Sequence, residues 1–149
     1  MITQQYEMVK GSRQVLLAYC DSLSDMHFTA PCAGFGHGGS IRNLLVHTCT
    51  TYQAWIGKRA LQLDFPYAAF HDVQNVDDAR QLFASIDQLL EAFFTRFLDM
   101  HELVNVPQGP TSALQLFTHV TTHEFHHKGQ ILSISRHFGY TPVDTDIMR

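Results

Sequence analysis

Residues 112–139, SALQLFTHVTTHEFHHKGQILSISRHFG, contain one long helix whose two ends are both marked in the sequence. Ser112 and Gln115 have the spacing of a capping box, in which each side chain bonds a backbone amide at the start of a helix. Gly139 supplies a stop after Phe138, because glycine readily adopts the left-handed conformation that ends many helices. We therefore predict a helix from Ser112 to about Phe138.

Three more stretches have apolar side chains three or four residues apart, which is typical of helices: residues 3–23, 41–60 and 79–100. Ser40 is placed to cap the second of these, and Asp77 or Asp78 the third. The third has a wide apolar face that extends to Leu98. No stretch shows the strict alternation of a strand. We predict an all-α fold, an antiparallel four-helix bundle.

Length and composition lead us to expect one domain covering residues 1–149. The ten lysines and arginines are scattered and the net charge is −4, so we expect neither nucleic acid nor an anionic membrane as a partner. The three cysteines are isolated from one another, which argues against a disulfide framework or a thiolate zinc site. No apolar run reaches the roughly 18 residues needed to span a bilayer. We therefore expect a soluble, cytoplasmic protein.

The last helix carries an unusual group of histidines. At about 100° per residue, with His123 as zero, a core-facing stripe lies between about 20° and 80°: Leu116, Val120, Ile131, Ile134 and Phe138. His123 and His127 fall within or beside this stripe, whereas Glu124 falls near 100° and is predicted to lie beside it without facing inward. The group at about −40° to −60° points away from the stripe: His119, His126 and His137.

Two histidines one turn apart that face a core share either a proton network or a cation, because an unpaired buried imidazole is unfavourable. The pair alone leaves both interpretations open. His47 lies at the edge of the apolar face of the second helix and is the best third ligand, which would complete a facial three-histidine site with open positions. His37 in a glycine-rich loop is a lesser candidate. The others are expected to be solvated: His27, His71 and His101.

Residues 123–127, HEFHH, also match the H-E-x-x-H pattern of zinc proteases. The extended form of that pattern requires glycine at position 130 and histidine at 133, where this chain has Gln130 and Ser133. No strand edge is predicted to bind a peptide, and Glu124 is not aimed at the histidine pair. We reject the protease interpretation.

Residues 119–130, HVTTHEFHHKGQ, resemble the fourth-helix signature of the DinB-like family, also called the DinB/YfiT-like metalloenzymes: a histidine pair spaced by four, followed by Arg or Lys, Gly and Gln. Residues 38–57, GGSIRNLLVHTCTTYQAWIG, are similar to the family's second helix, and residues 138–148, FGYTPVDTDIM, to its ending. Lys128 stands where arginine is more usual and keeps the charge. The resemblance implies an antiparallel four-helix bundle, often a homodimer, that binds a divalent metal ion, nickel or zinc, through His47, His123 and His127.

The same resemblance implies a metal-dependent thiol S-transferase, or a related hydrolase or isomerase, that takes a small-molecule substrate and a low-molecular-weight thiol such as mycothiol or bacillithiol. A thiol beside a divalent cation loses its proton easily, and the thiolate is the nucleophile. Gln130 and His119 would support the ligands or face the substrate. Two alternatives stay open: a metal-binding stress-response protein without turnover, and a metal-free bundle whose histidines are only hydrogen-bonded.

Overall fold

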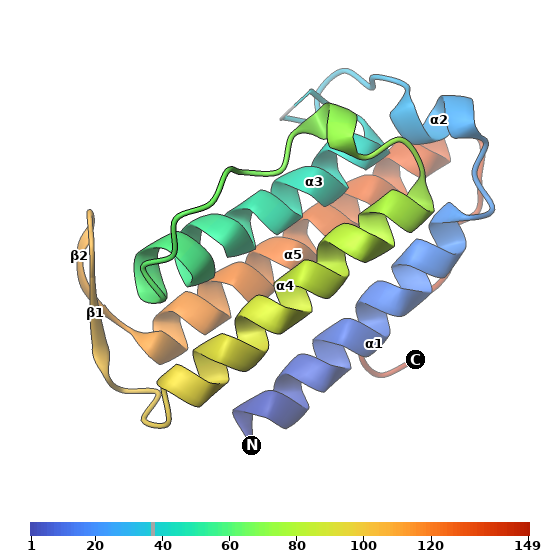
Figure 1. Ribbon diagram of the computed structural model, residues 1–149. Helices are drawn as coiled ribbons and strands as arrows, with labels where there is room; N and C mark the ends of the chain where they lie inside the picture. Colours follow the sequence, from blue (N-terminus) through green and yellow to red (C-terminus); the bar gives the residue numbers. More distant parts are fainter. Residues whose placement is uncertain (37) are drawn as a thin grey trace.

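The computed structural model describes residues 1–36 and 38–149 and confirms the helical bundle (Figure 1). Four long helices pack side by side: α1 (Ile2–Cys20), α3 (Ile41–Tyr52), α4 (Val76–Arg96) and α5 (Ala113–His137). A π-helical segment, η1 (Gln53–Ala60), continues α3 without a break. α1 and α5 run in one direction and α3 and α4 in the other, because the connection of residues 61–75 passes back along the bundle (Figure 1).

Both predicted ends of α5 are confirmed. The Ser112 hydroxyl accepts a hydrogen bond from the backbone amide of Gln115 at 3.1 Å, and the Gln115 side chain accepts one from the amide of Ser112 at 2.9 Å. At the other end, Gly139 has a φ of 88°, in the left-handed region that glycine favours. The predicted Ser40 cap of α3 is also present and accepts from the amide of Asn43 at 3.0 Å.

The predicted cap of α4 is wrong. Asn75 is the capping residue: its side chain accepts from the amide of Asp78 at 2.9 Å, and the Asp78 carboxylate accepts from the amide of Asn75 at 3.2 Å. Asp77 and Asp78 therefore lie in the first turn, where negative side chains favour the helix dipole. The helix ends at Arg96, so Leu98 follows it and is 89% exposed, outside the apolar face that the sequence predicted.

The expectation that no strand is present is also wrong. β1 (Leu103–Val106) and β2 (Gly109–Ser112) form an antiparallel hairpin before α5. Each strand has four residues, which is too short to show a clear alternation in the sequence. Two further short elements lie at the edges of the bundle, α2 (Asp25–Thr29) and the 3-10 turn η2 (Phe70–Asp72).

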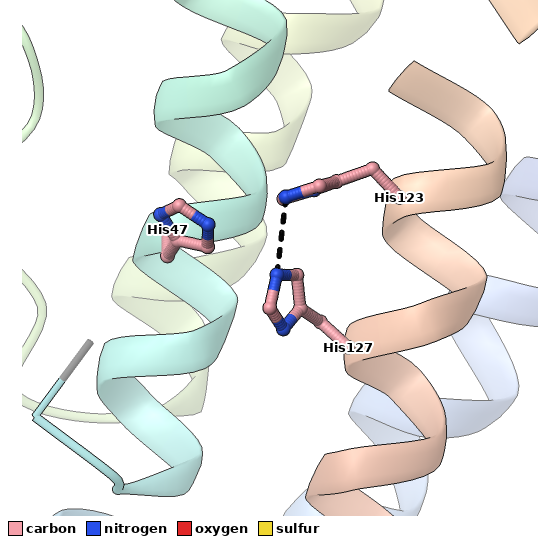
Figure 2. A group of neighbouring side chains, drawn as sticks. All are labelled: His47, His123 and His127. Carbon is pink, nitrogen blue, oxygen red and sulfur yellow. Dashed lines mark hydrogen bonds between the residues drawn. The ribbon is translucent and has the colours of Figure 1, made fainter. Parts of the chain in front are cut away.

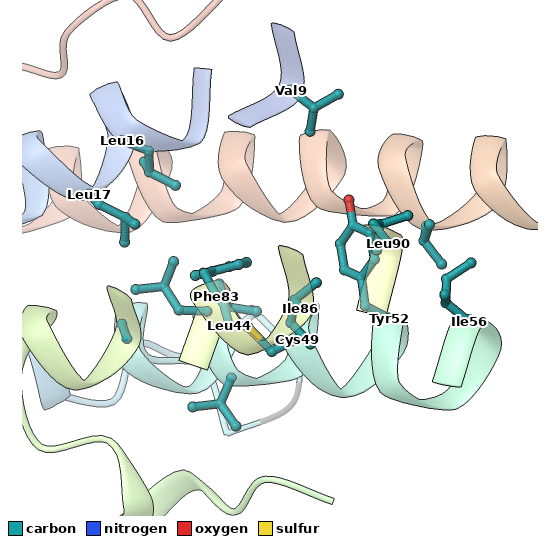
Figure 3. Close-up of a cluster of buried hydrophobic side chains, with 14 of the residues drawn as sticks. Val9, Leu16, Leu17, Leu44, Cys49, Tyr52, Ile56, Phe83, Ile86 and Leu90 are labelled. Carbon is teal, nitrogen blue, oxygen red and sulfur yellow. The ribbon is translucent and has the colours of Figure 1, made fainter. Parts of the chain in front are cut away.

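The core lies between the four long helices, with side chains from α1, α3, α4 and η1 converging on it (Figure 3): Val9, Leu16, Leu17, Leu44, Cys49, Tyr52, Ile56, Phe83, Ile86 and Leu90. All three cysteines are free thiols. Burial raises the pKa of Cys20 to about 12 and also raises the pKa of Cys49. Among the described helices, none has the length and apolar character required to cross a bilayer.

Candidate functional site

Three histidines from two helices face one another across the contact between α3 and α5 (Figure 2). His47 projects from α3, and His123 and His127 project from successive turns of α5. One ligand atom from each ring lies within 4.8 Å of the others, and the two Nε2 atoms of His123 and His127 are 3.1 Å apart. The structure thus brings together the three residues that the sequence singled out, and this cluster could bind a metal ion.

One pair of ring nitrogens in the cluster has the spacing of metal ligands. Zinc–nitrogen bonds of about 2.0–2.1 Å, at angles of about 90–110°, place two ligand nitrogens roughly 2.9–3.4 Å apart. The separation of 3.1 Å between His123 and His127 falls in this range, although a shared proton gives a similar distance. Separations of up to 4.8 Å within the cluster are wider, so one ion bound by all three rings would draw them about 1–2 Å closer together.

Gln130 determines which nitrogen of His127 faces the cluster. Its side-chain oxygen lies 2.6 Å from Nδ1 of His127. An amide oxygen only accepts, so Nδ1 carries the proton and the lone pair lies on Nε2, toward His123. Metal-binding histidines commonly have such a partner on the second nitrogen. The predicted supporting role of Gln130 therefore agrees with its position, one turn after His127 on the same helix.

The environment also keeps His123 uncharged. Burial, reinforced by the neighbouring imidazoles of His127 and His47, lowers the pKa of His123 to about 3. The ring is therefore neutral at physiological pH, which is the state that binds metals. Among the described residues, none offers a hydrogen-bond partner to the buried Nδ1 of His123. The polar interaction of this ring is thus on the Nε2 side, toward His127.

The other histidines lie mostly as predicted. His119, His126 and His137 of α5 are exposed, as are His71 and His101.

His27 differs from the prediction, because it is not simply solvated. Its ring stacks on Phe138 with centroids 4.5 Å apart, and its Nδ1 lies 2.9 Å from the hydroxyl of Tyr140. The aromatic residues that follow α5 pack against α2 and shield this histidine. His37, the lesser ligand candidate, lies outside the described residues.

Glu124 does not lie where the helical wheel placed it. It is only 3% exposed, at the centre of the buried face of α5. That face also includes polar side chains, which the apolar pattern did not count: Thr121, Lys128 and Ser135. With them included, the buried face spans about 20–160° and the position of Glu124 near 100° is central. His123 and His127 lie at one edge of this face, next to α3.

Glu124 belongs to a charged network that the sequence analysis missed. Its two carboxylate oxygens accept hydrogen bonds from Nε and Nη2 of Arg13, both at 3.0 Å, and one of them also accepts from the Tyr52 hydroxyl at 2.7 Å. Arg13 further pairs with Asp87 at 2.7 Å, and the Tyr6 hydroxyl donates to Asp87 at 2.7 Å. Burial alone would lower the pKa of Arg13, but the charge of Glu124 raises it above its ordinary value.

A sequence signal for this network was present. Arg13 lies four residues after Val9 and seven after Tyr6, which puts a charged residue on the apolar stripe of α1. Glu124 similarly lies four residues after Val120 and seven before Ile131, on the apolar stripe of α5. Charged side chains are almost never fully buried unless they are paired, so two such residues on two inward stripes indicate an ion pair.

An open groove of about 440 Å³ borders the histidine cluster on the side of α3 and η1. His47 lies at one end of its lining, and Arg59 and Tyr67 are also part of it. Between them lies Trp55, whose ring contacts His119 edge to face with centroids 4.9 Å apart. A small molecule in this groove would lie against His47, the member of the cluster that lines it.

Comparison with known proteins identifies one family. The sequence model of the DinB family matches residues 1–149, including both helices that carry the cluster. No curated protein matches the chain.

Proposed function

Because the chain belongs to the DinB family, we propose that His47, His123 and His127 bind one divalent metal ion, zinc or nickel. The observation that supports this most directly is the convergence of three imidazoles with ring nitrogens within 4.8 Å of one another. Zinc and nickel both accept imidazole ligands. Three protein ligands leave at least one coordination position open, which is typical of catalytic sites.

We propose further that the site serves a thiol S-transferase that uses a low-molecular-weight thiol. A divalent cation held there would lower the pKa of a thiol, so that the thiolate is present at neutral pH. The reaction joins the thiol sulfur to an electrophilic carbon, while the thiol proton goes to solvent and the leaving group departs with the bonding electron pair. Cys20 and Cys49 cannot supply this sulfur, because both are buried and burial raises their pKa. The group of ligand residues around His47 does not include Cys32 either, so the proposal takes the sulfur from an external thiol.

The chain's own side chains would hold the site in its working form. Gln130 keeps the Nε2 lone pair of His127 directed at the cluster, and the low pKa of His123 keeps that ring neutral. The groove beside His47 would admit the substrate while the bundle core excludes water from the other side. His119, whose ring contacts Trp55 edge to face, would contact a bound molecule that extends past Trp55.

Thiol transfer can be tested with the zinc-loaded protein, 1-chloro-2,4-dinitrobenzene and a panel of thiols that includes cysteine, glutathione, mycothiol and bacillithiol. We expect S-conjugate formation with at least one thiol, a loss of about 100-fold or more in His123→Ala, and reversal of chelator inhibition by added metal. Transfer that persists unchanged in the chelator would overturn the proposal. Stoichiometric metal without transfer to any thiol would instead support the alternative, a non-catalytic metal-binding protein.

A further inference from the structure

The groove beside the cluster is lined by one continuous row of side chains. His47, Thr51, Trp55 and Arg59 are four residues apart in the sequence, and all four line it. In a regular α-helix, residues four apart drift around the axis by about 40° per step, so this row would leave the groove. The π-helical segment from Gln53 to Ala60 bonds i to i+5 and turns less per residue, which reverses the drift. The change of helix type therefore keeps Trp55 and Arg59 on the side of His47.

Arg59 is the cation of this row. Its guanidinium lies over the Trp55 ring, 4.1 Å from the centroid. In the part of the chain that the structure describes, Arg59 has no carboxylate partner, whereas Arg13, Arg80 and Arg96 each pair with at least one. An arginine that lies over an aromatic ring can still donate N–H hydrogen bonds to a carboxylate.

The distance from this cation to the cluster is suitable for one small molecule. The ring of His123 lies 6.0 Å from that of His119, which lies 4.9 Å from Trp55, and Arg59 lies 4.1 Å beyond. The guanidinium is therefore no more than ~15 Å from His123 along this path. Tyr67 forms another part of the groove wall and is half exposed. The groove thus offers a cation, two aromatic side chains and the imidazole of His47, the member of the cluster that lines it.

We propose that this groove binds a small organic carboxylate. Its carboxylate pairs with Arg59, its flat or apolar body lies against Trp55 and Tyr67, and its reactive end reaches the three histidines. The inference rests on the proposed function for the identity of the reactive end, but the pairing with Arg59 stands on the groove alone. The carboxylate belongs either to the thiol or to its electrophilic partner, and the two sources share the same recognition chemistry.

Trp55 is the only tryptophan of the chain, so its fluorescence reports on the groove directly. The probes are 3-phenylpropionate and its neutral amide, titrated against the full chain with and without zinc. We expect the carboxylate to give a saturable change and to bind about tenfold more tightly than the amide. In Arg59→Gln this preference should disappear, whereas in Arg136→Gln, which changes an exposed arginine of α5, it should remain. Circular dichroism establishes that both variants are folded.

Equal binding of the two probes, no saturable response, or an unchanged preference in Arg59→Gln would overturn the inference. The same titration in His123→Ala tests carboxylate binding separately from the proposed function. If neither the parent nor His123→Ala binds metal but both prefer the carboxylate through Arg59, the metal proposal is wrong and the carboxylate proposal stands. The source of the carboxylate follows from a second pair of probes, cysteine and cysteamine. Tighter, Arg59-dependent binding of cysteine assigns the carboxylate to the thiol, and equal binding of the two assigns it to the electrophile.

Discussion

Gln130 is not part of the histidine cluster, but its side-chain oxygen holds the ring of His127, which is. Without its side-chain oxygen, the proton on Nδ1 loses its acceptor at 2.6 Å and either nitrogen can carry it. Removing such a supporting group typically weakens metal affinity by about 10–100-fold. We therefore expect Gln130→Leu to weaken zinc binding in a competition titration by that factor, with one ion still bound per chain.

His126→Ala, which removes an exposed imidazole beside His127, is the control and should bind zinc as the parent does. Unchanged affinity in Gln130→Leu would show that the ring is held by other contacts.

The low pKa of His123 makes a second prediction, for stability against pH in the metal-free protein. The ring takes up a proton near pH 6.5 in the unfolded chain but only near pH 3 in the folded one. Its contribution is fully present above about pH 6.5 and is lost as the pH falls toward 3. Because the ring is partly exposed, we expect a loss of about 1 kcal/mol between pH 7 and pH 5, measured by urea unfolding.

The matched variants for this pH dependence are His123→Gln and His126→Gln. The first should flatten the decline in the free energy of unfolding between pH 7 and pH 5, because its amide does not titrate. The second changes an exposed histidine of the same helix and should keep the parental slope. A parental slope in His123→Gln would assign the decline to other groups.

At the scale of single elements, the helix ends that depend on residues close together in the chain could be predicted from the sequence. The capping box of Ser112 and Gln115 and the stop at Gly139 are local features, so both ends of α5 were found. The centre of its buried face was not, because Glu124 and Lys128 occupy it and their burial depends on partners in another helix, Arg13 and Ser12. The hairpin was missed for a related reason, since strands of four residues are specified by their pairing.

The cap of α4 gives a prediction at this scale. Asn75→Ala removes the side-chain acceptor for the amide of Asp78, and we expect it to lower the free energy of unfolding by about 1 kcal/mol. Asp77→Ala, at one of the two positions that the sequence favoured, removes an exposed ion pair with Arg80 and one negative charge from the first turn, and should lower stability by no more than about 0.5 kcal/mol. Urea unfolding of the two variants measures both effects. The reverse order of effects would restore Asp77 as the capping residue.

In the whole molecule, one charged network links the four long helices through α1, α3, α4 and α5. Arg13 and Glu124 are separated by 111 positions in the chain, so no local pattern pairs them. Removal of one member leaves a buried charge without compensation, and we expect Glu124→Ala to lower the free energy of unfolding by about 3–5 kcal/mol.

The double variant Arg13→Met with Glu124→Leu tests whether this loss comes from the unpaired charge. It replaces both charges by apolar side chains of similar size, and it should be clearly more stable than Glu124→Ala. A double variant as unstable as the single one would show that the loss comes from packing or from the bonds to Tyr52 and Asp87.

The three histidines of the cluster could be predicted from the sequence. His123 and His127 are one turn apart and could be paired from spacing alone, and His47 was found from its place on the face of its own helix. The exact arrangement of the groove could not be predicted, because it depends on the change from α- to π-helix after Tyr52, for which the sequence has no simple signal.

The most direct test of the proposed metal site is the metal content of the protein, purified without a nickel-affinity step and analysed by inductively coupled plasma mass spectrometry after zinc or nickel loading and dialysis. We expect one ion per chain in the parent and in the controls His119→Ala and His126→Ala. We expect less than about one tenth of an ion per chain in His47→Ala, His123→Ala and His127→Ala, with helical content unchanged. Full occupancy in any of these three variants would show that the replaced histidine is not a ligand.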